Sequence, residues 1–445
     1  MDLKDNNMIN KVLAFLLLIA TPSLALASYP ELFGASYTTS AIGNQFNGDQ
    51  NDPSNNYYAP AVLGFTNKFN VYLGATSTAV YFEKINNIVV KNTSTSGVTE
   101  YGNVDVNYPK FYGNALHLSI PVGGQEHLGT IALSAFFPIG DIIKASSGHP
   151  YLPEYVMYRS RHQRTSLYLN FAKSLSDSWA VSLGTILGFQ ASALVKTNMS
   201  LNGTSYPSWV TAQAEVEPSL GVIASVVKRF EKAQAYLTYQ QEMKSNLKAQ
   251  LNGEISNPTA ALFDSTMDQM LSYDPHTIRV GANKSFEKTE VFGALEYQIW
   301  SQYKTPKMHI IQNSGVVLSS KEFEKLSLRD TINPRLGVRY NWNKHFSTMI
   351  GAQYRMTPFK GDFNGKGNSV DVDSLIGAIG GEYRFTLFSK DVQLGGSFQY
   401  HKLASKHVTK TPGMENDQAG DKIGAPGYDI GGHIIAGSVG LKFNF

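Results

Sequence analysis

The connections between segments of alternating polarity constrain this fold more than any other feature of the sequence. The short joins are 123–127, 174–178, 228–232, 286–289, 341–344 and 389–390, and they alternate with long joins at 83–110, 139–162, 196–211, 254–274, 312–331, 359–373 and 409–427. An outer-membrane barrel places tight turns at one end and long loops at the other, whereas a soluble sandwich has no reason to keep this order. We therefore predict a closed antiparallel barrel with both termini at the end of the short turns.

About fourteen segments carry the alternation, which is an even number within the range of bacterial barrels. They are 67–82, 111–122, 128–138, 163–174, 178–195, 212–228, 233–253, 275–286, 290–311, 332–342, 345–358, 374–387, 390–408 and 428–445. In 332–342, Leu336 and Val338 share one face and Arg335 and Arg339 the other. An apolar face toward lipid and a polar face toward the lumen predict an all-β, membrane-spanning antiparallel β-barrel, with its wall in residues 67–445.

The first 27 residues have the organisation of a secretory signal peptide. Lys11 precedes a short apolar run at 12–20, Pro22 interrupts it, and Ala25-Leu26-Ala27 forms a small-residue cleavage pattern. We predict cleavage before Ser28. No later segment approaches the apolar length of a spanning helix, so a mature protein in a membrane must cross it with a closed barrel.

Composition narrows the class further. The chain has 445 residues, 12% aromatic residues, 39 Gly and zero Cys, which fits one β-rich envelope protein without disulfides or thiolate metal sites. A net charge of +3 without a basic block interleaved with aromatics argues against nucleic acid as a partner. We predict no metal, no cofactor and a monomer that contacts outer-membrane lipid and lipopolysaccharide.

Residues 33–65 interrupt the alternating pattern with an irregular polar segment. Gly43, Pro53 and Pro60 break any periodicity, and the Asp-Pro-Ser turn begins at Asp52. Taken alone, the segment fits a disordered mature N-terminus. Because a barrel of this kind follows the segment, the segment also fits a compact domain folded inside the lumen. We assign residues 28–66 to that domain.

The last strand ends the chain on an aromatic residue. Val439, Leu441, Phe443 and Phe445 alternate with polar or small residues. A terminal aromatic after such alternation resembles the signal read by the outer-membrane barrel-assembly machinery, and Phe445 is its candidate contact. The same pattern also fits an ordinary closing strand.

Dispersed motifs over the whole mature chain resemble the FadL family of outer-membrane transporters for long-chain fatty acids and other hydrophobic compounds, which includes TodX-type hydrocarbon channels. Residues 36–44 (SYTTSAIGN) and 52–64 (DPSNNYYAPAVLG) are similar to the family's N-terminal pattern. LEYQIWSQY at 295–303 resembles its strand with tyrosine, two residues and tryptophan. Position 59 departs from it, because Ala59 stands where the family usually places Asn before Pro-Ala.

The resemblance implies a 14-stranded barrel whose lumen is closed by a small N-terminal hatch. Its residues would include Phe33, Gly43, Asn44, Asp52, Pro53, Tyr57, Tyr58 and Pro60. It also implies passive, hatch-gated uptake of a fatty acid or hydrocarbon, with sideways exit through a kinked third strand. Pro138 and Gly140 are the candidate gate, since Pro cannot donate to a ladder and Gly tolerates bends. An ordinary strand end has the same residues.

Two further groups of residues are candidates for ligand contact. In loop 254–274, Leu262, Phe263, Met267, Met270 and Leu271 are apolar, and the last four share one face of a predicted short helix. Exposed at the mouth, this face would be a landing site for hydrophobic ligand, whereas packed against other loops it would be structural. Tyr151, Tyr155, Met157 and Tyr158 in loop 139–162 form a weaker second candidate.

A carboxylate headgroup would need a cation in the lumen. Arg279, Arg335, Arg339, Arg355 and Arg384 face the lumen by alternation, and the planar guanidinium suits a carboxylate. Glu217, Glu296 and Glu382 are predicted to share that lumen, so structural ion pairs are the alternative that we favour for each arginine.

Two other function classes remain open. A barrel enzyme of the lipase or protease type would need a base beside a nucleophile, and the sequence contains no GxSxG or HExxH. A general porin usually narrows its pore with an inner loop and has no need of an irregular N-terminal segment. We therefore predict a channel rather than an enzyme.

Overall fold

The computed structural model describes residues 30–93, 98–108, 110–124, 127–138, 152–158, 165–188, 191–199, 208–257, 259–304, 309–313, 316–317, 326–361, 368–410 and 423–445. The predicted signal peptide and its cleavage position lie outside these ranges. None of the helices in the described ranges has the length and apolar content needed to cross a bilayer.

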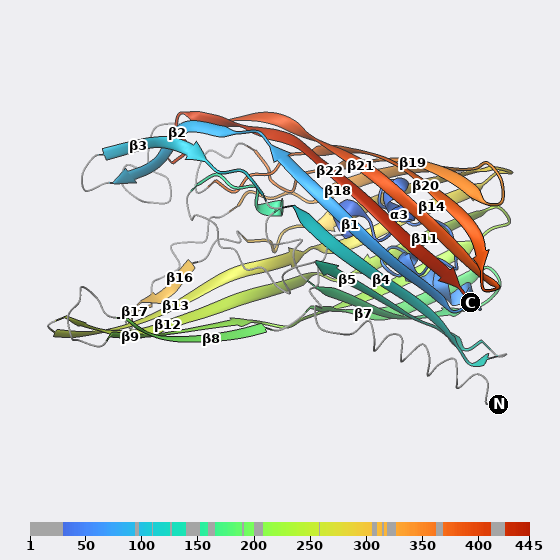
Figure 1. Ribbon diagram of the computed structural model, residues 1–445, viewed down its shortest axis with the longest axis horizontal. Helices are drawn as coiled ribbons and strands as arrows, with labels where there is room; N and C mark the ends of the chain where they lie inside the picture. Colours follow the sequence, from blue (N-terminus) through green and yellow to red (C-terminus); the bar gives the residue numbers. More distant parts are fainter. Residues whose placement is uncertain are drawn as a thin grey trace.

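Fourteen antiparallel strands close into a barrel (Figure 1). In chain order they are β1 (Asn70–Phe82), β4 (Phe111–Val122), β5 (Gly129–Pro138), β6 (Ser166–Ser174), β7 (Trp179–Gly188), β10 (Ser219–Arg229), β11 (Ala233–Gln240), β14 (His276–Ser285), β15 (Thr289–Ile299), β18 (Thr331–Asn341), β19 (Phe346–Arg355), β20 (Ser374–Leu387), β21 (Lys390–Thr409) and β22 (Gly427–Asn444). β1 pairs with both β4 and β22 and so closes the wall. The predicted all-β barrel of about 14 strands is confirmed.

The two faces of the wall differ as the alternation predicted. On β18, Leu336 is 66% exposed on the outside while Arg335 is 2% exposed on the inside. Closure satisfies every ladder hydrogen bond, and the outer apolar band removes the cost of placing polar groups in lipid. This is the architecture of a protein of the bacterial outer membrane.

The short joins lie at the barrel end where the C-terminus is found (Figure 1). Phe388 and Ser389 form the tightest turn between β20 and β21, and both have positive φ, at 48° and 61°. Positive φ at both central residues gives the turn the twist that a two-residue hairpin needs. At the same end, the Phe445 amide donates to the Phe69 carbonyl at 2.9 Å. The role of Phe445 in assembly stays a prediction.

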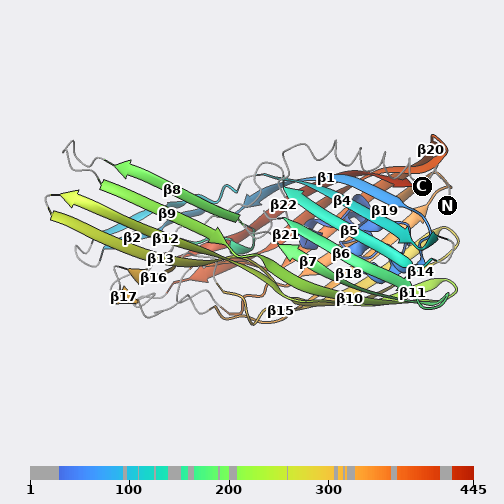
Figure 2. The same cartoon turned by 90° about the horizontal axis from the view of Figure 1, so that it is seen from below.

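The prediction that the long joins are irregular loops is wrong for several of them. A six-stranded sheet, which we call the extramembrane sheet, extends from the barrel on the side opposite the C-terminus (Figure 2). Its strands are β8 (Ala191–Met199), β9 (Ser208–Val216), β12 (Met243–Asn257), β13 (Thr259–Asp274), β16 (His309–Asn313) and β17 (Val316–Val317), while β2 (Ile85–Thr93) and β3 (Val98–Val104) form a separate hairpin. The segments predicted at 178–195, 212–228 and 233–253 therefore each divide between the wall and this sheet.

The short helix predicted within 254–274 is also wrong, because these residues form β13. β12 and β13 pair from Met243 opposite Asp274 to Asn257 opposite Thr259, so the hairpin satisfies backbone groups that a single exposed helical turn would leave to water. The apolar residues have a helical spacing because a β-bulge inserts Leu271 as an extra residue into β13. Leu271 packs with Val216 and Leu247.

Residues 30–65, which we call the N-terminal segment, lie inside the barrel near the end with the short turns (Figure 1). The segment contains α2 (Pro30–Phe33), α3 (Tyr37–Ala41) and the 3-10 helices η1 (Pro53–Asn56) and η2 (Pro60–Phe65). Ser36 caps α3 with a reciprocal capping box and Asp52 caps η1 through the Ser54 amide at 3.0 Å. These local caps let short helices form without a long apolar face.

Candidate functional site

The residues predicted for the hatch are all buried inside the wall. They are Phe33, Gly43, Asn44, Asp52, Pro53, Tyr57, Tyr58 and Pro60. Gly43 has a φ of +86°, and a Cβ there would come within 2.7 Å of the Ala352 carbonyl oxygen on β19. Gly43 therefore combines a left-handed backbone with close approach to the wall, a pair of conditions that only glycine meets without strain.

Asn44 ties the N-terminal segment to two strands through its side chain. Its Nδ2 donates to Gln353 Oε1 at 2.9 Å, and its Oδ1 accepts from Gln399 Nε2 at 2.7 Å. Ala59, in contrast, precedes η2 without any side-chain capping bond. The position where the sequence departs from the family pattern is thus a helix N-cap that lacks a polar side chain.

A buried lysine of the last strand holds the N-terminal segment from the opposite side. Lys442 Nζ lies 3.0 Å from Asp49 Oδ2 and 3.4 Å from Asp52 Oδ2, and its side chain is 2% exposed. Burial alone would raise the pKa of Asp49, but the Lys442 ammonium and the Asn51 amide outweigh it and lower that pKa to about 2. The pKa of Asp52 is lowered by the same ammonium, again against the effect of burial.

Glu296 lies between two of the predicted lumen arginines. Its Oε2 accepts from Arg279 Nε and its Oε1 from Arg335 Nη2, both at 2.6 Å, and all three side chains are buried. Arg279 also donates from Nη1 to Gln240 at 3.0 Å and from Nη2 to the Tyr57 hydroxyl at 3.2 Å. Arg335 donates to the Asn44 carbonyl. This triad therefore joins the wall to the N-terminal segment.

The other three predicted arginines are ion-paired too. Arg339 contacts Glu290 at 3.2 Å, Arg355 contacts Asp371 at 3.1 Å, and Arg384 contacts Glu382 at 2.7 Å. Glu296 and Glu382 share the lumen as predicted, but Glu217 does not. It lies between β9 and β10, is exposed, and pairs with Lys248 of the extramembrane sheet at 2.6 Å. The alternating pattern predicted the wrong location for Glu217, because the predicted strand 212–228 is interrupted at that residue, between β9 and β10.

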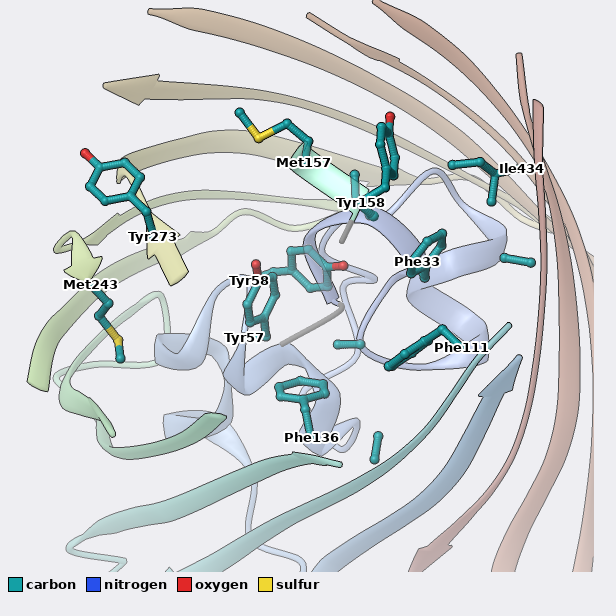
Figure 3. Close-up of a cluster of buried hydrophobic side chains, with 14 of the residues drawn as sticks. Phe33, Tyr57, Tyr58, Phe111, Phe136, Met157, Tyr158, Met243, Tyr273 and Ile434 are labelled. Atoms are coloured by element: carbon teal, nitrogen blue, oxygen red, sulfur yellow. The ribbon is translucent and has the colours of Figure 1, made fainter. Parts of the chain in front are cut away.

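Apolar and aromatic side chains converge in the interior above the N-terminal segment (Figure 3). We call them the lumen cluster, and its members are Phe33, Tyr57, Tyr58, Phe111, Phe136, Met157, Tyr158, Met243, Tyr273 and Ile434. Tyr57 packs edge-on against Tyr58 with ring centroids 4.8 Å apart and against Phe136 at 5.9 Å. The cluster combines residues of the wall, the N-terminal segment, the mouth and the strands β12 and β13, so it is an apolar region that a hydrophobic molecule would meet inside.

A second closure lies toward the mouth of the barrel. Residues 152–158, which contain η4 (Val156–Tyr158), are joined to residues 368–373 by a parallel bridge between Glu154 and Ser369. The Tyr155 ring stacks on Phe82 of β1 at 3.8 Å, and its hydroxyl accepts from the Gly431 amide at 2.8 Å. We call residues 152–158 and 368–373 the mouth segments. The sequence named Tyr155, Met157 and Tyr158 as a second candidate for ligand contact, and the structure buries all three, while Tyr151 lies outside the described residues.

The remaining predicted site residues are placed as follows. Leu262 and Phe263 lie on β13, paired with Glu254 and Gly253. Met267 is half-buried, and Met270 and Leu271 are buried. Pro138 ends β5, which pairs with β4 residue by residue from Gly129 onward without a register shift. Gly140 lies outside the described residues, so the gate stays a prediction.

Comparisons with known proteins agree with this architecture. No family model matches the chain. Alkane uptake protein A of Marinobacter nauticus is 31% identical over 195 residues, which is 42% of this chain and only 40% of that protein. Among solved structures, a Pseudomonas aeruginosa FadL homologue has a TM-score of 0.61 with 14% identity and covers 96% of this chain and 99% of its own.

Two hydrocarbon transporters are similar in structure as well. The toluene transporter TodX of P. putida has a TM-score of 0.52 with 11% identity, over 93% of this chain and 98% of its own. The toluene transporter TbuX of Ralstonia pickettii has a TM-score of 0.51 with 13% identity, over 94% and 100%. The chain therefore has the fold of the FadL-type channels, as its sequence resemblance predicted.

Proposed function

We propose that this protein is an outer-membrane channel for the passive uptake of hydrophobic small molecules, with the N-terminal segment as its hatch. The observation that carries the proposal is the lumen cluster, in which buried aromatic and apolar side chains of the wall, the N-terminal segment and the mouth gather inside one barrel. The proteins similar to it in fold or sequence include transporters of toluene and an alkane uptake protein, which supports a cargo of this kind.

The energetics favour capture of a hydrophobic chain without any covalent step. Each methylene removed from water gains about 0.8 kcal/mol, so a long chain would gain about 10 kcal/mol as a ceiling before ordering costs are subtracted. A closed interior also prevents leakage of polar solutes. The hatch and the mouth segments would have to move for transport, and hydrophobic ligand would compete for the contacts of the lumen cluster.

The extramembrane sheet offers an entry surface. On β12, Leu247, Ala249 and Leu251 share one face, which is partly or fully buried, while Lys248 and Gln250 on the other face are exposed. Met267 of β13 lies opposite Ala249 and belongs to the apolar face. Met243, the first residue of β12, is a member of the lumen cluster. We propose that ligand lands on this face and moves along β12 to the lumen.

The enzyme and general-porin alternatives have less support. The similar proteins named above include toluene transporters and an alkane uptake protein, and the interior is occupied by the N-terminal segment rather than open. A general porin would need a wet pore instead.

Growth and uptake measurements test the proposal. A deletion strain should lose uptake of hydrophobic carbon sources and regain it with the wild-type gene, and native mass spectrometry of gently extracted protein should detect bound hydrophobic molecules. Complementation with Leu336→Ala, which changes only a lipid-facing side chain, is the matched control and should restore uptake. Unchanged growth of the deletion strain together with an empty lumen would reject the proposal.

A further inference from the structure

The buried charges of the interior are balanced. Among the described residues, the six buried cations are Arg279, Arg335, Arg339, Arg355, Lys410 and Lys442, and six carboxylates are buried as well. Two half-buried carboxylates, those of Asp49 and Glu290, also face Lys442 and Arg339. The part of the interior that the structure describes therefore carries no excess of buried positive charge that could neutralise an incoming anion.

The donors of Arg279 and the terminal donors of Arg355 are committed to protein partners. All three nitrogens of Arg279 donate, to Glu296, Gln240 and Tyr57. The two terminal nitrogens of Arg355 both donate to Asp371, and Nη1 also contacts the Tyr158 hydroxyl at 3.2 Å. A ligand carboxylate would have to displace an existing carboxylate from one of these pairs. That exchange gains nothing electrostatically and leaves the displaced group buried without its partner.

The histidines beside the cluster have partners too. His117 Nε2 donates to the Ala35 carbonyl at 2.8 Å and its Nδ1 lies 2.7 Å from the Ser134 hydroxyl. Because a carbonyl can only accept, Nε2 carries a proton, and the Ser134 hydroxyl is the partner of Nδ1. His401 Nε2 lies 3.1 Å from Gln399 and its ring packs on Phe33 at 5.4 Å.

We infer that the lumen selects uncharged hydrophobic molecules, such as an alkane, against ionised fatty acids of the same length. This inference rests on the proposed function and names its substrate class. The arginines are structural ion-pair partners that fix the N-terminal segment and the mouth, and they do not receive a ligand headgroup. An apolar chain needs only the surface of the lumen cluster, whereas an ionised carboxylate would be desolvated without compensation.

A matched ligand series tests the inference on the wild-type protein. Hexadecane, hexadecan-1-ol and hexadecanoate would be titrated into detergent-solubilised protein at mildly alkaline pH, with occupancy read by native mass spectrometry. We expect the alkane and the alcohol to bind, and the acid to bind at least about tenfold more weakly. Equal or tighter binding of the acid would overturn the inference while leaving the proposed function intact. Binding of none of the three would reject the proposed function itself.

Substitution of an acidic partner provides the converse test. Glu296→Gln keeps the shape of the side chain and frees two guanidinium groups, so it should raise the affinity for hexadecanoate at least about tenfold and leave that for hexadecane unchanged. Asp371→Asn, which frees Arg355 at the mouth, is a second variant if the first does not fold. Glu217→Gln, whose pair with Lys248 lies outside the lumen, is the control and should change neither affinity. Folded lumen variants without any gain for the acid would overturn the inference.

Discussion

The two closures of the barrel interior are built from different interactions. Besides aromatic packing, the N-terminal segment is held to the wall by the buried ion pair of Lys442 with Asp52 and by hydrogen bonds of Arg279 and Asn44. The mouth segments are held largely by aromatic packing, with Tyr155 stacked on Phe82, and only one of their described contacts to the wall is a buried ion pair, that of Arg355 with Asp371. A hydrophobic ligand can replace aromatic contacts but cannot replace buried ion pairs. The comparison therefore predicts that ligand displaces the mouth segments first, while the N-terminal segment, which forms the lower closure, stays docked to the wall.

The largest effect should come from removing the lower closure. Deletion of residues 33–65 should increase single-channel conductance in planar bilayers strongly, because these residues fill the lumen while the ladder of the wall remains intact. Deletion of residues 252–263, at the tip of the β12–β13 hairpin, is the control and should leave the conductance near that of the wild type. Unchanged conductance after removal of 33–65 would show that the segment is no plug.

Loss of the lysine anchor should come next. Lys442→Met leaves Asp52 buried and Asp49 half-buried without their cation, which should cost about 3 to 5 kcal/mol of docking of the N-terminal segment. More frequent channel openings and faster proteolysis within the N-terminal segment would indicate the weaker docking. Lys68→Met removes an exposed pair with Asp391 and should change docking by less than about 1 kcal/mol. Equal effects of the two substitutions would contradict the comparison.

Acidification should weaken the lower closure but not the aromatic contacts of the upper one. The pKa of Asp49 is lowered from 3.8 to about 2, so its contribution is complete above about pH 4 and is lost as the pH falls through about 2. Allowing for partial exposure, this amounts to on the order of 1 to 2 kcal/mol. Proteolysis of the reconstituted protein after brief acid exposure should show cleavage in residues 30–65 appearing over that interval. Cleavage that begins above pH 5, or never begins, would argue against the anchor.

The smallest effect should come from the hydroxyl of Tyr155. Tyr155→Phe keeps the stack on Phe82 and removes the hydrogen bonds to Gly431, at a cost of about 1 kcal/mol. Ligand entry should accelerate by about fivefold in an uptake assay. Tyr112→Phe, on the lipid-facing side of β4, is the matched control. The same acceleration in both variants would exclude a specific role for the mouth contact.

The wall could be predicted from the sequence because it obeys one periodic rule. Alternation placed Arg335 and Arg339 inside and Leu336 outside, and the lengths of the joins placed the turns. The sequence named Glu217, Glu296 and Glu382 as candidate partners of the arginines, which was wrong for Glu217. The pairs themselves could not be assigned, since register across strands depends on the whole closed ladder. Asp371, the partner of Arg355, lies in a long join where no period applies.

The extramembrane sheet could not be predicted by the same rule. β11 and β12 are separated only by Gln241 and Glu242, so one continuous strand fitted the pattern as well as two. Leu271 then produced a false helical spacing, because a bulge shifts the period by one residue. The mouth segments were missed for another reason. Their burial follows from contacts with Phe82 and Gly431, which lie far away in the sequence, and no local pattern encodes such contacts.

The most direct test of the account is to locate a ligand in the interior. A crystal structure with a terminally brominated alkane should show an anomalous bromine signal beside the lumen cluster, near Tyr58 and Met157, with the pair between Arg279 and Glu296 intact. Bromine found only on the lipid-facing surface, with the lumen cluster packed as it is without ligand, would contradict the account.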